Sequence, residues 1–239
     1  MRTLPLTPDV RAYAIAATVV YSLSCAWLAG IVVARSRRAR DVGFLGVYVA
    51  ILLLVAAPAV LVLRPAHVTG PALGRIALAV PLGAVAGCVC VWAEVLVTRA
   101  VRRRERARRE TRRSADQPLR YAAAAPPGAL QDRAFEMVQG QPRRGRILAL
   151  LLAVATLEEI LFRGVLLDLA LSLPGDVAAG AAICGIAIAF ALTHVSFGWT
   201  AVVGKLPLAA IATAAALLTG TVAAAVAAHA VVNARAWRS

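Results

Sequence analysis

The chain has 239 residues, of which 61% are apolar and 16% are charged, and its formal net charge is +14. A soluble domain is nearer to half apolar and about a quarter charged, so the composition excludes an ordinary globular protein and favours a membrane protein. The positive charge does not indicate a nucleic-acid partner, because the arginines form short blocks between long apolar runs, as topology signals in membrane proteins do.

Seven apolar runs are long enough to predict membrane-spanning helices, since a span needs about 20 apolar residues, with a range of about 17 to 25. The expected spans are Ala12–Ala34, Gly43–Leu63, Ile76–Thr98, Ile147–Leu167, Val177–Phe197, Ala201–Leu218 and Thr221–Trp237. The fold class predicted is therefore an all-α, polytopic transmembrane bundle of about seven or eight helices, which is located in the cell membrane and has the lipid bilayer as its surroundings.

Basic residues predict the orientation of these helices, because loops rich in arginine and lysine stay in the cytoplasm. The blocks are Arg35, Arg37, Arg38 and Arg40 after the first run, nine arginines within 99–113 after the third, and Arg143, Arg144 and Arg146 before the fourth. All three blocks lie on the cytoplasmic side if the N-terminus is outside. We expect three regions: an N-terminal three-helix region with a basic cytoplasmic end (1–113), a flexible cytoplasmic linker (114–146) and a C-terminal catalytic region (147–239).

Two polar residues outside the last four runs receive structural interpretations. Glu94 lies near the expected cytoplasmic end of the third span, close to Arg99, where its carboxylate can reach the interface. His67 lies in an outer loop that also contains Pro65 and Pro71, and we expect it to be solvated.

The fourth run carries three charged residues, Glu158, Glu159 and Arg163, in an aliphatic setting. An ionised side chain near the centre of a spanning helix costs about 2.5 to 3.5 kcal/mol, so such residues need a reason to be there. Glu159 and Arg163 are four residues apart and share a helix face, which predicts an ion pair. Glu158 points about 100° away around the helix. It is therefore the carboxylate that this arginine cannot easily satisfy, and it is the candidate for chemistry.

Two more polar pairs occur in the C-terminal runs, each with four-residue spacing. Phe190 precedes His194 by one turn in the fifth run, and His229 precedes Asn233 in the seventh. A single membrane histidine usually forms an interhelical hydrogen bond. Together, however, the carboxylates, imidazoles and amide predict one internal polar cluster with the base and donors that amide hydrolysis requires.

The three motifs resemble those of a known family. Glu158-Glu159-x-x-x-Arg163, Phe190-x-x-x-His194 and His229-x-x-x-Asn233 are similar to the signatures of the CAAX-protease and bacteriocin-processing family of intramembrane peptidases, which includes the Rce1-type prenyl-protein proteases. The resemblance covers residue 147 to the C-terminus. It implies a helical bundle around a polar cavity, with an additional span hidden in Asp168–Asp176 if this chain has the eight spans common in that family.

The resemblance also implies roles for individual residues. Glu158 and His194 would activate a water molecule, His229 and Asn233 would bind the oxyanion or complete the site, and Glu159 and Arg163, with Phe190, would support it. Both a metal-dependent and a metal-free mechanism remain open. Zinc would accept Glu158, His194 and His229 as ligands and keep a fourth position for water, whereas the His-Glu-x-x-His helix of many zinc peptidases is missing.

We therefore expect an intramembrane endopeptidase that cleaves a peptide or membrane-protein substrate. The bias towards alanine and arginine favours a bacterial plasma membrane, in which prenylated tails are not expected. The alternative is a non-catalytic immunity or scaffold protein that keeps the polar cluster for helix packing. A transporter with a proton relay is a third interpretation, but no inverted repeat supports it.

Overall fold

The computed structural model describes residues 8–35, 43–70, 73–115 and 144–238. These residues form helices and turns without any strand, which confirms the all-α prediction. The helices are α1 (Pro8–Arg35), α3 (Phe44–Leu63), α4 (Ala66–Thr69), α5 (Leu73–Ala115), α7 (Arg144–Glu159), α8 (Leu167–Leu171), α9 (Asp176–Leu192), α10 (Trp199–Thr219) and α11 (Val222–Arg238). A π-helix, η1 (Ile160–Leu166), joins α7 to α8, and a 3₁₀ turn, η2 (Val195–Phe197), precedes α10.

Several helices have the character of membrane spans. Among the described residues, Phe44–Leu63, Leu73–Arg108 and Trp199–Thr219 are long and apolar enough to cross a bilayer, and Asp176–Leu192 is a shorter apolar helix. Helix α3 contains Pro58 and α10 contains Pro207, which spanning helices tolerate because neighbouring helices and local adjustments satisfy the freed carbonyls. The larger number of spans read from the apolar runs stays a prediction.

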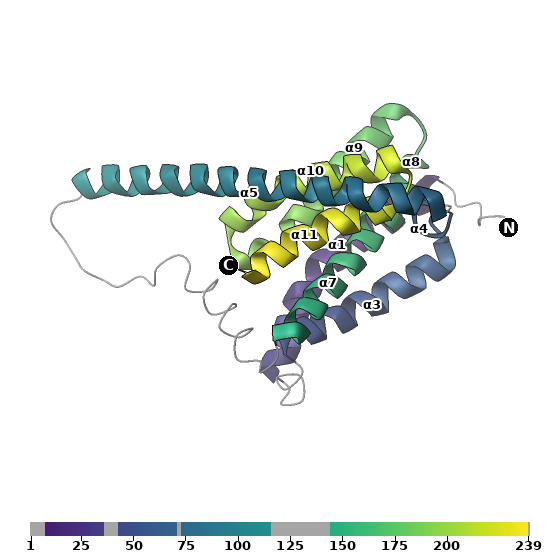
Figure 1. The fold of residues 1–239 in the computed structure, drawn as a ribbon, viewed down its shortest axis with the longest axis horizontal. Helices are drawn as coiled ribbons and strands as arrows, with labels where there is room; N and C mark the ends of the chain where they lie inside the picture. The colour runs from purple at the N-terminus through teal and green to yellow at the C-terminus, as the bar shows by residue number, and fades with distance from the viewer. Residues whose placement is uncertain (1–7, 36–42, 71–72, 116–143, 239) are drawn as a thin grey trace.

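Three expected boundaries were wrong. The third helix does not end at Thr98: α5 continues through the arginine block to Ala115 and extends past the rest of the bundle (Figure 1). Strong helix formers such as arginine and alanine favour this continuation. The fifth helix ends at Leu192 rather than at Phe197. Asp168–Asp176 holds the end of α8 and a turn rather than a hidden span.

Other expectations concern residues that the structure does not describe. Most of the expected linker 114–146 falls within 116–143, which lies outside the described residues. Arg37, Arg38 and Arg40 also lie outside the described residues. Arg144 and Arg146 belong to α7.

Small residues allow α5 and α11 to pack closely, and these two helices run beside each other in Figure 1. A Cβ atom added to Gly83 would lie 2.1 Å from the carbonyl oxygen of Ala224, and one added to Gly87 would lie 2.7 Å from that of Ala228. Only glycine fits at such a crossing, as in other membrane helix pairs with small residues at the interface. Helix α11 carries His229, so this contact helps to fix the position of His229 relative to α5.

Two apolar clusters fill the bundle. One surrounds Phe162 and Phe190 and includes small residues of α10 and α11, such as Ala212 and Ala225. The other lies between α1, α3 and α7 and includes Tyr48. The polar site lies where these clusters meet, so helices from both halves of the sequence enclose it.

His67 is bound rather than solvated, contrary to expectation. Both its backbone N–H and its Nδ1 atom face the carboxylate of Asp168, and the two side chains are only 12% and 19% exposed. Val68 of the same short helix packs against Gly164 of η1. Helix α4 is thereby held against the helical segment that follows the two glutamates.

Candidate active site

Glu159 is the centre of the buried charge network. Its Oε1 atom accepts hydrogen bonds from Arg163 Nη1 at 3.2 Å and from His229 Nδ1 at 2.8 Å, and its Oε2 atom lies 3.1 Å from the same arginine nitrogen. All three residues are at most 1% exposed. The ion pair expected from the four-residue spacing is thus present, and it links α7 and η1 to α11.

Arg163 has partners beyond the carboxylate. Its Nε donates to Thr213 Oγ1 at 3.3 Å and its Nη2 donates to the Ala209 carbonyl at 3.0 Å, both on α10. A buried guanidinium needs acceptors for its N–H groups as well as a carboxylate that balances its charge. The π-helix carries Arg163 towards α10, and π-helical turns are frequent at functional sites.

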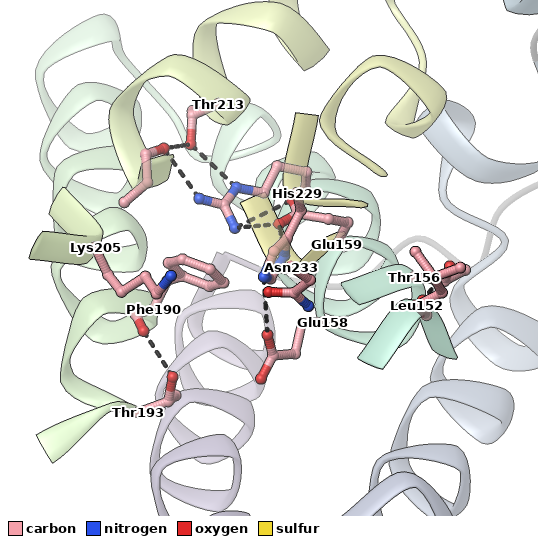
Figure 2. A network of polar contacts seen from close by, with 12 residues as sticks. Leu152, Thr156, Glu158, Glu159, Phe190, Thr193, Lys205, Thr213, His229 and Asn233 are labelled. Carbon is pink, nitrogen blue, oxygen red and sulfur yellow. Dashed lines mark hydrogen bonds and ion pairs between the residues drawn. The ribbon is translucent and has the colours of Figure 1, made fainter. Parts of the chain in front are cut away.

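Glu158 lies beside this network. Among the described residues, no ion pair joins it to Arg163. Its Oε1 atom accepts a hydrogen bond from the hydroxyl of Tyr48 at 2.7 Å, and its Oε2 atom lies 3.9 Å from His229 Nε2. Figure 2 shows Glu158, Glu159 and His229 gathered in one place, with Phe190 and Lys205 to one side. Arg163 pairs with Glu159 and not with Glu158, as the helix geometry predicts; the catalytic role of Glu158 stays a prediction.

Phe190 connects the two histidines. Its ring lies 4.1 Å beneath the Arg163 guanidinium carbon, and its centroid is 5.7 Å from that of His229 and 5.6 Å from that of His194. A cation over an aromatic face is stabilised by the ring quadrupole. The phenylalanine of the second motif therefore packs against the arginine of the first.

His194 is placed differently from the expectation. It lies in the turn after α9 rather than inside a helix, and the structure brings its ring against Phe190 and Phe197 rather than against Glu158. The Thr193 hydroxyl donates to the Phe190 carbonyl, so its oxygen accepts from His194 Nδ1 at 3.0 Å. A neutral ring in this arrangement keeps its Nε2 lone pair for another partner.

Asn233 ties α11 to α7. Its amide nitrogen donates to the Leu151 carbonyl at 3.0 Å, almost two turns before Glu158. The side chain is only partly buried. Its amide oxygen and second N–H therefore remain able to contact a substrate.

The expected metal ligands do not form a ligand group in this arrangement. Within the part of the chain that the structure describes, no three His, Cys, Asp or Glu side chains are placed to hold one ion. His229 Nδ1 is bonded to Glu159, and Glu158 is already bonded to Tyr48. Zinc binding by Glu158, His194 and His229 would therefore require their side chains to rearrange.

Sequence reasoning missed three participants: Tyr48, Thr213 and Lys205. Tyr48 and Thr213 look unremarkable in an apolar run, although each is a hydroxyl in a setting where a buried donor needs a partner. Lys205 lies within α10 and pairs with Glu94 of α5 at 3.2 Å. Glu94 therefore pairs with a lysine of another helix rather than depending on Arg99 and the interface.

One comparison with known proteins gave a match. Residues 142–235 match the family described as Rce1-like, the type II CAAX prenyl endopeptidases. No curated protein and no solved structure gave a match. The matched residues contain all three motifs, whereas Tyr48, Gly83 and Glu94 precede them.

Proposed function

Because residues 142–235 match the Rce1-like family of type II CAAX prenyl endopeptidases, we propose that this chain is a multi-pass intramembrane endopeptidase of the bacterial plasma membrane. Its substrate in this proposal is a peptide bond of a membrane-associated protein or peptide. The observation that supports it most directly is the position of Glu158, a buried carboxylate beside an imidazole but not paired with the arginine. A prenylated cysteine is not part of the proposal.

The proposed reaction begins with Glu158 as general base. Its Oε2 atom and His229 Nε2 are 3.9 Å apart, so one water molecule can donate to both at the usual distance of about 2.8 Å. Loss of one proton to Glu158 lets the water oxygen attack the peptide carbonyl carbon. The protonated Glu158 then returns the proton to the leaving amine as the carbon–nitrogen bond breaks.

The proposal gives His229 and His194 different roles. The resemblance assigns the second water-activating group to His194, whereas the observed distances favour His229. Asn233 is then the group that donates to the developing oxyanion, whereas the Nε2 lone pair of His194 makes this ring a second proton acceptor. Aligned donors of this kind are typically worth 10²- to 10³-fold each in rate, which is on the order of 3 to 4 kcal/mol.

His194→Ala separates these assignments from a structural role. The His194 side chain has a local hydrogen bond to Thr193, so its removal should leave the bundle folded. A folded variant without activity supports catalysis by His194. A folded variant with full activity leaves His229 as the imidazole of the site.

The experiment for the proposed function compares wild type with Glu158→Gln, both purified in detergent and incubated with a peptide library, with and without a strong zinc chelator. Glutamine keeps the shape of the side chain and can still accept from Tyr48, but it cannot take a proton. Loss of cleavage in the variant with indifference to chelation supports direct activation of water. Loss in the variant together with chelator-sensitive, zinc-restored cleavage in wild type supports a metallopeptidase. Equal cleavage by both proteins refutes the assignment of Glu158.

A further inference from the structure

Tyr48 lies near the start of α3, far from the family motifs in sequence. It is the residue of α3 that reaches the polar site, and its hydroxyl donates to Glu158 Oε1 at 2.7 Å. The matched region begins at residue 142, so neither the motifs nor the family match assigns this residue. The contact joins residues 110 positions apart in the sequence.

Packing of the Tyr48 ring restricts the direction in which its hydroxyl can point. Tyr48 is 7% exposed, and its ring stacks on Phe44 with centroids 6.0 Å apart. It packs in the cluster between α1, α3 and α7 that includes Leu157, the residue before Glu158. A ring fixed by its neighbours costs little further rotamer freedom when its hydroxyl binds a partner.

The bond distinguishes the two oxygen atoms of one carboxylate. Oε1 is occupied by the tyrosine hydroxyl, while Oε2 faces His229 Nε2 at 3.9 Å. Terminal carboxylate torsions are broad and roughly two-fold, so without a donor on one oxygen the group could turn freely about this bond. A charged hydrogen bond of this length is among the stronger kinds in proteins.

We propose that Tyr48 is a positioning residue that fixes the Glu158 carboxylate with Oε2 towards His229 and the reacting water. This inference rests on the proposed function, because it assigns to Glu158 the role of base. It extends the site beyond the matched domain, since α3 becomes part of the machinery rather than only a membrane anchor. Tyr48 acts through Glu158 and does not contact the substrate.

The test replaces Tyr48 with phenylalanine, which retains the ring and its packing. The matched control is Thr156→Val on α7, which also removes one hydroxyl from the same region, but one that bonds only to the Leu152 carbonyl of its own helix at 2.9 Å. Kinetics use a peptide that wild type cleaves. We expect Tyr48→Phe to lower kcat about 10- to 100-fold, the range for losing a hydrogen bond to a charged group, with little change in KM, while Thr156→Val remains at wild-type values.

A second measurement does not depend on activity. The infrared difference between wild type and Glu158→Gln identifies the carboxylate stretching bands of Glu158, and the inference expects Tyr48→Phe to shift them while Thr156→Val does not. Unshifted bands, or wild-type kcat in Tyr48→Phe, overturn the inference while leaving the peptidase proposal intact. If wild type cleaves nothing, the proposed function fails, and the infrared bands alone decide whether Tyr48 holds Glu158.

A fluorinated tyrosine at position 48 covers the case in which phenylalanine disturbs folding. It keeps the ring and the hydroxyl but makes the hydroxyl a stronger donor, so the Glu158 bands should shift in the direction opposite to that caused by loss of the donor. Bands that do not respond to the fluorine contradict the inference.

Discussion

Replacement of Gly83 by alanine tests the close crossing of α5 and α11. The new Cβ atom would lie 2.1 Å from the Ala224 carbonyl oxygen, whereas ordinary contacts of this kind begin at 3.4 Å. The nearest atoms at this position are backbone atoms of Ala224, which cannot rotate away. The helices must therefore separate by roughly 1 Å, and overpacking of this type typically costs about 1 to 3 kcal/mol.

The displaced helix carries His229, so activity should fall as well. A misplacement of about 1 Å can reduce a rate on the order of 10²-fold. We expect Gly83→Ala to lower the free energy of unfolding, measured by circular dichroism in mixed micelles with increasing SDS, and to lower peptide cleavage at least tenfold at a temperature where the protein remains folded.

Gly74→Ala is the matched control. Gly74 is on the same helix, and a Cβ atom added there meets nothing within 4 Å. Alanine is up to about 1 kcal/mol better than glycine within a helix, so this variant should be as stable as wild type or slightly more stable. Equal stability and activity of the two variants would refute the reasoning, because the only intended difference between them is the contact with α11.

Two further predictions concern ion pairs. Glu159→Gln leaves Arg163 as a buried charge without its carboxylate and should reduce the free energy of unfolding by about 3 to 5 kcal/mol. The double variant Glu159→Gln, Arg163→Met should lose less stability, and additive losses in this double-mutant cycle would contradict the coupling. Glu94→Gln and Lys205→Met should each destabilise the contact between α5 and α10, and the double variant should recover part of the loss; a cycle without coupling energy, measured in lipid nanodiscs, would mean that the pair contributes nothing.

Local spacing was sufficient to predict part of the site. The pairing of Glu159 with Arg163 followed from four-residue spacing on one helix, and it survives although the backbone becomes a π-helix just after Glu159. The separation of Glu158 from Arg163 followed from the same geometry. The motif resemblance predicted a family whose model matches residues 142–235.

Contacts between distant parts of the chain could not be predicted in this way. Nothing in the apolar run 44–63 indicates which side of α3 faces α7, so the partnership of Tyr48 with Glu158 depends on packing of whole helices. The position of His194 was missed because the apolar character continues past Leu192 while the helix does not. A glycine with φ of 95° at position 198 allows the turn that ends this segment, and such a glycine was the available signal.

The length of α5 has a mechanical consequence. Its 43 residues extend about 65 Å at about 1.5 Å per residue, roughly twice the thickness of a bilayer core of about 30 Å. Gly83 and Gly87 hold the helix against α11 near one end, and Glu94 and Glu105 contact Lys205 and Thr200 of α10 further along. Helix α5 therefore acts as a splint that ties α10 to the helix that carries His229, and the part of it beyond Glu105 is only about 15 Å long. A pair of spin labels on α5 and α10 should accordingly report one narrow distance distribution, and a broad distribution would contradict this rigid coupling.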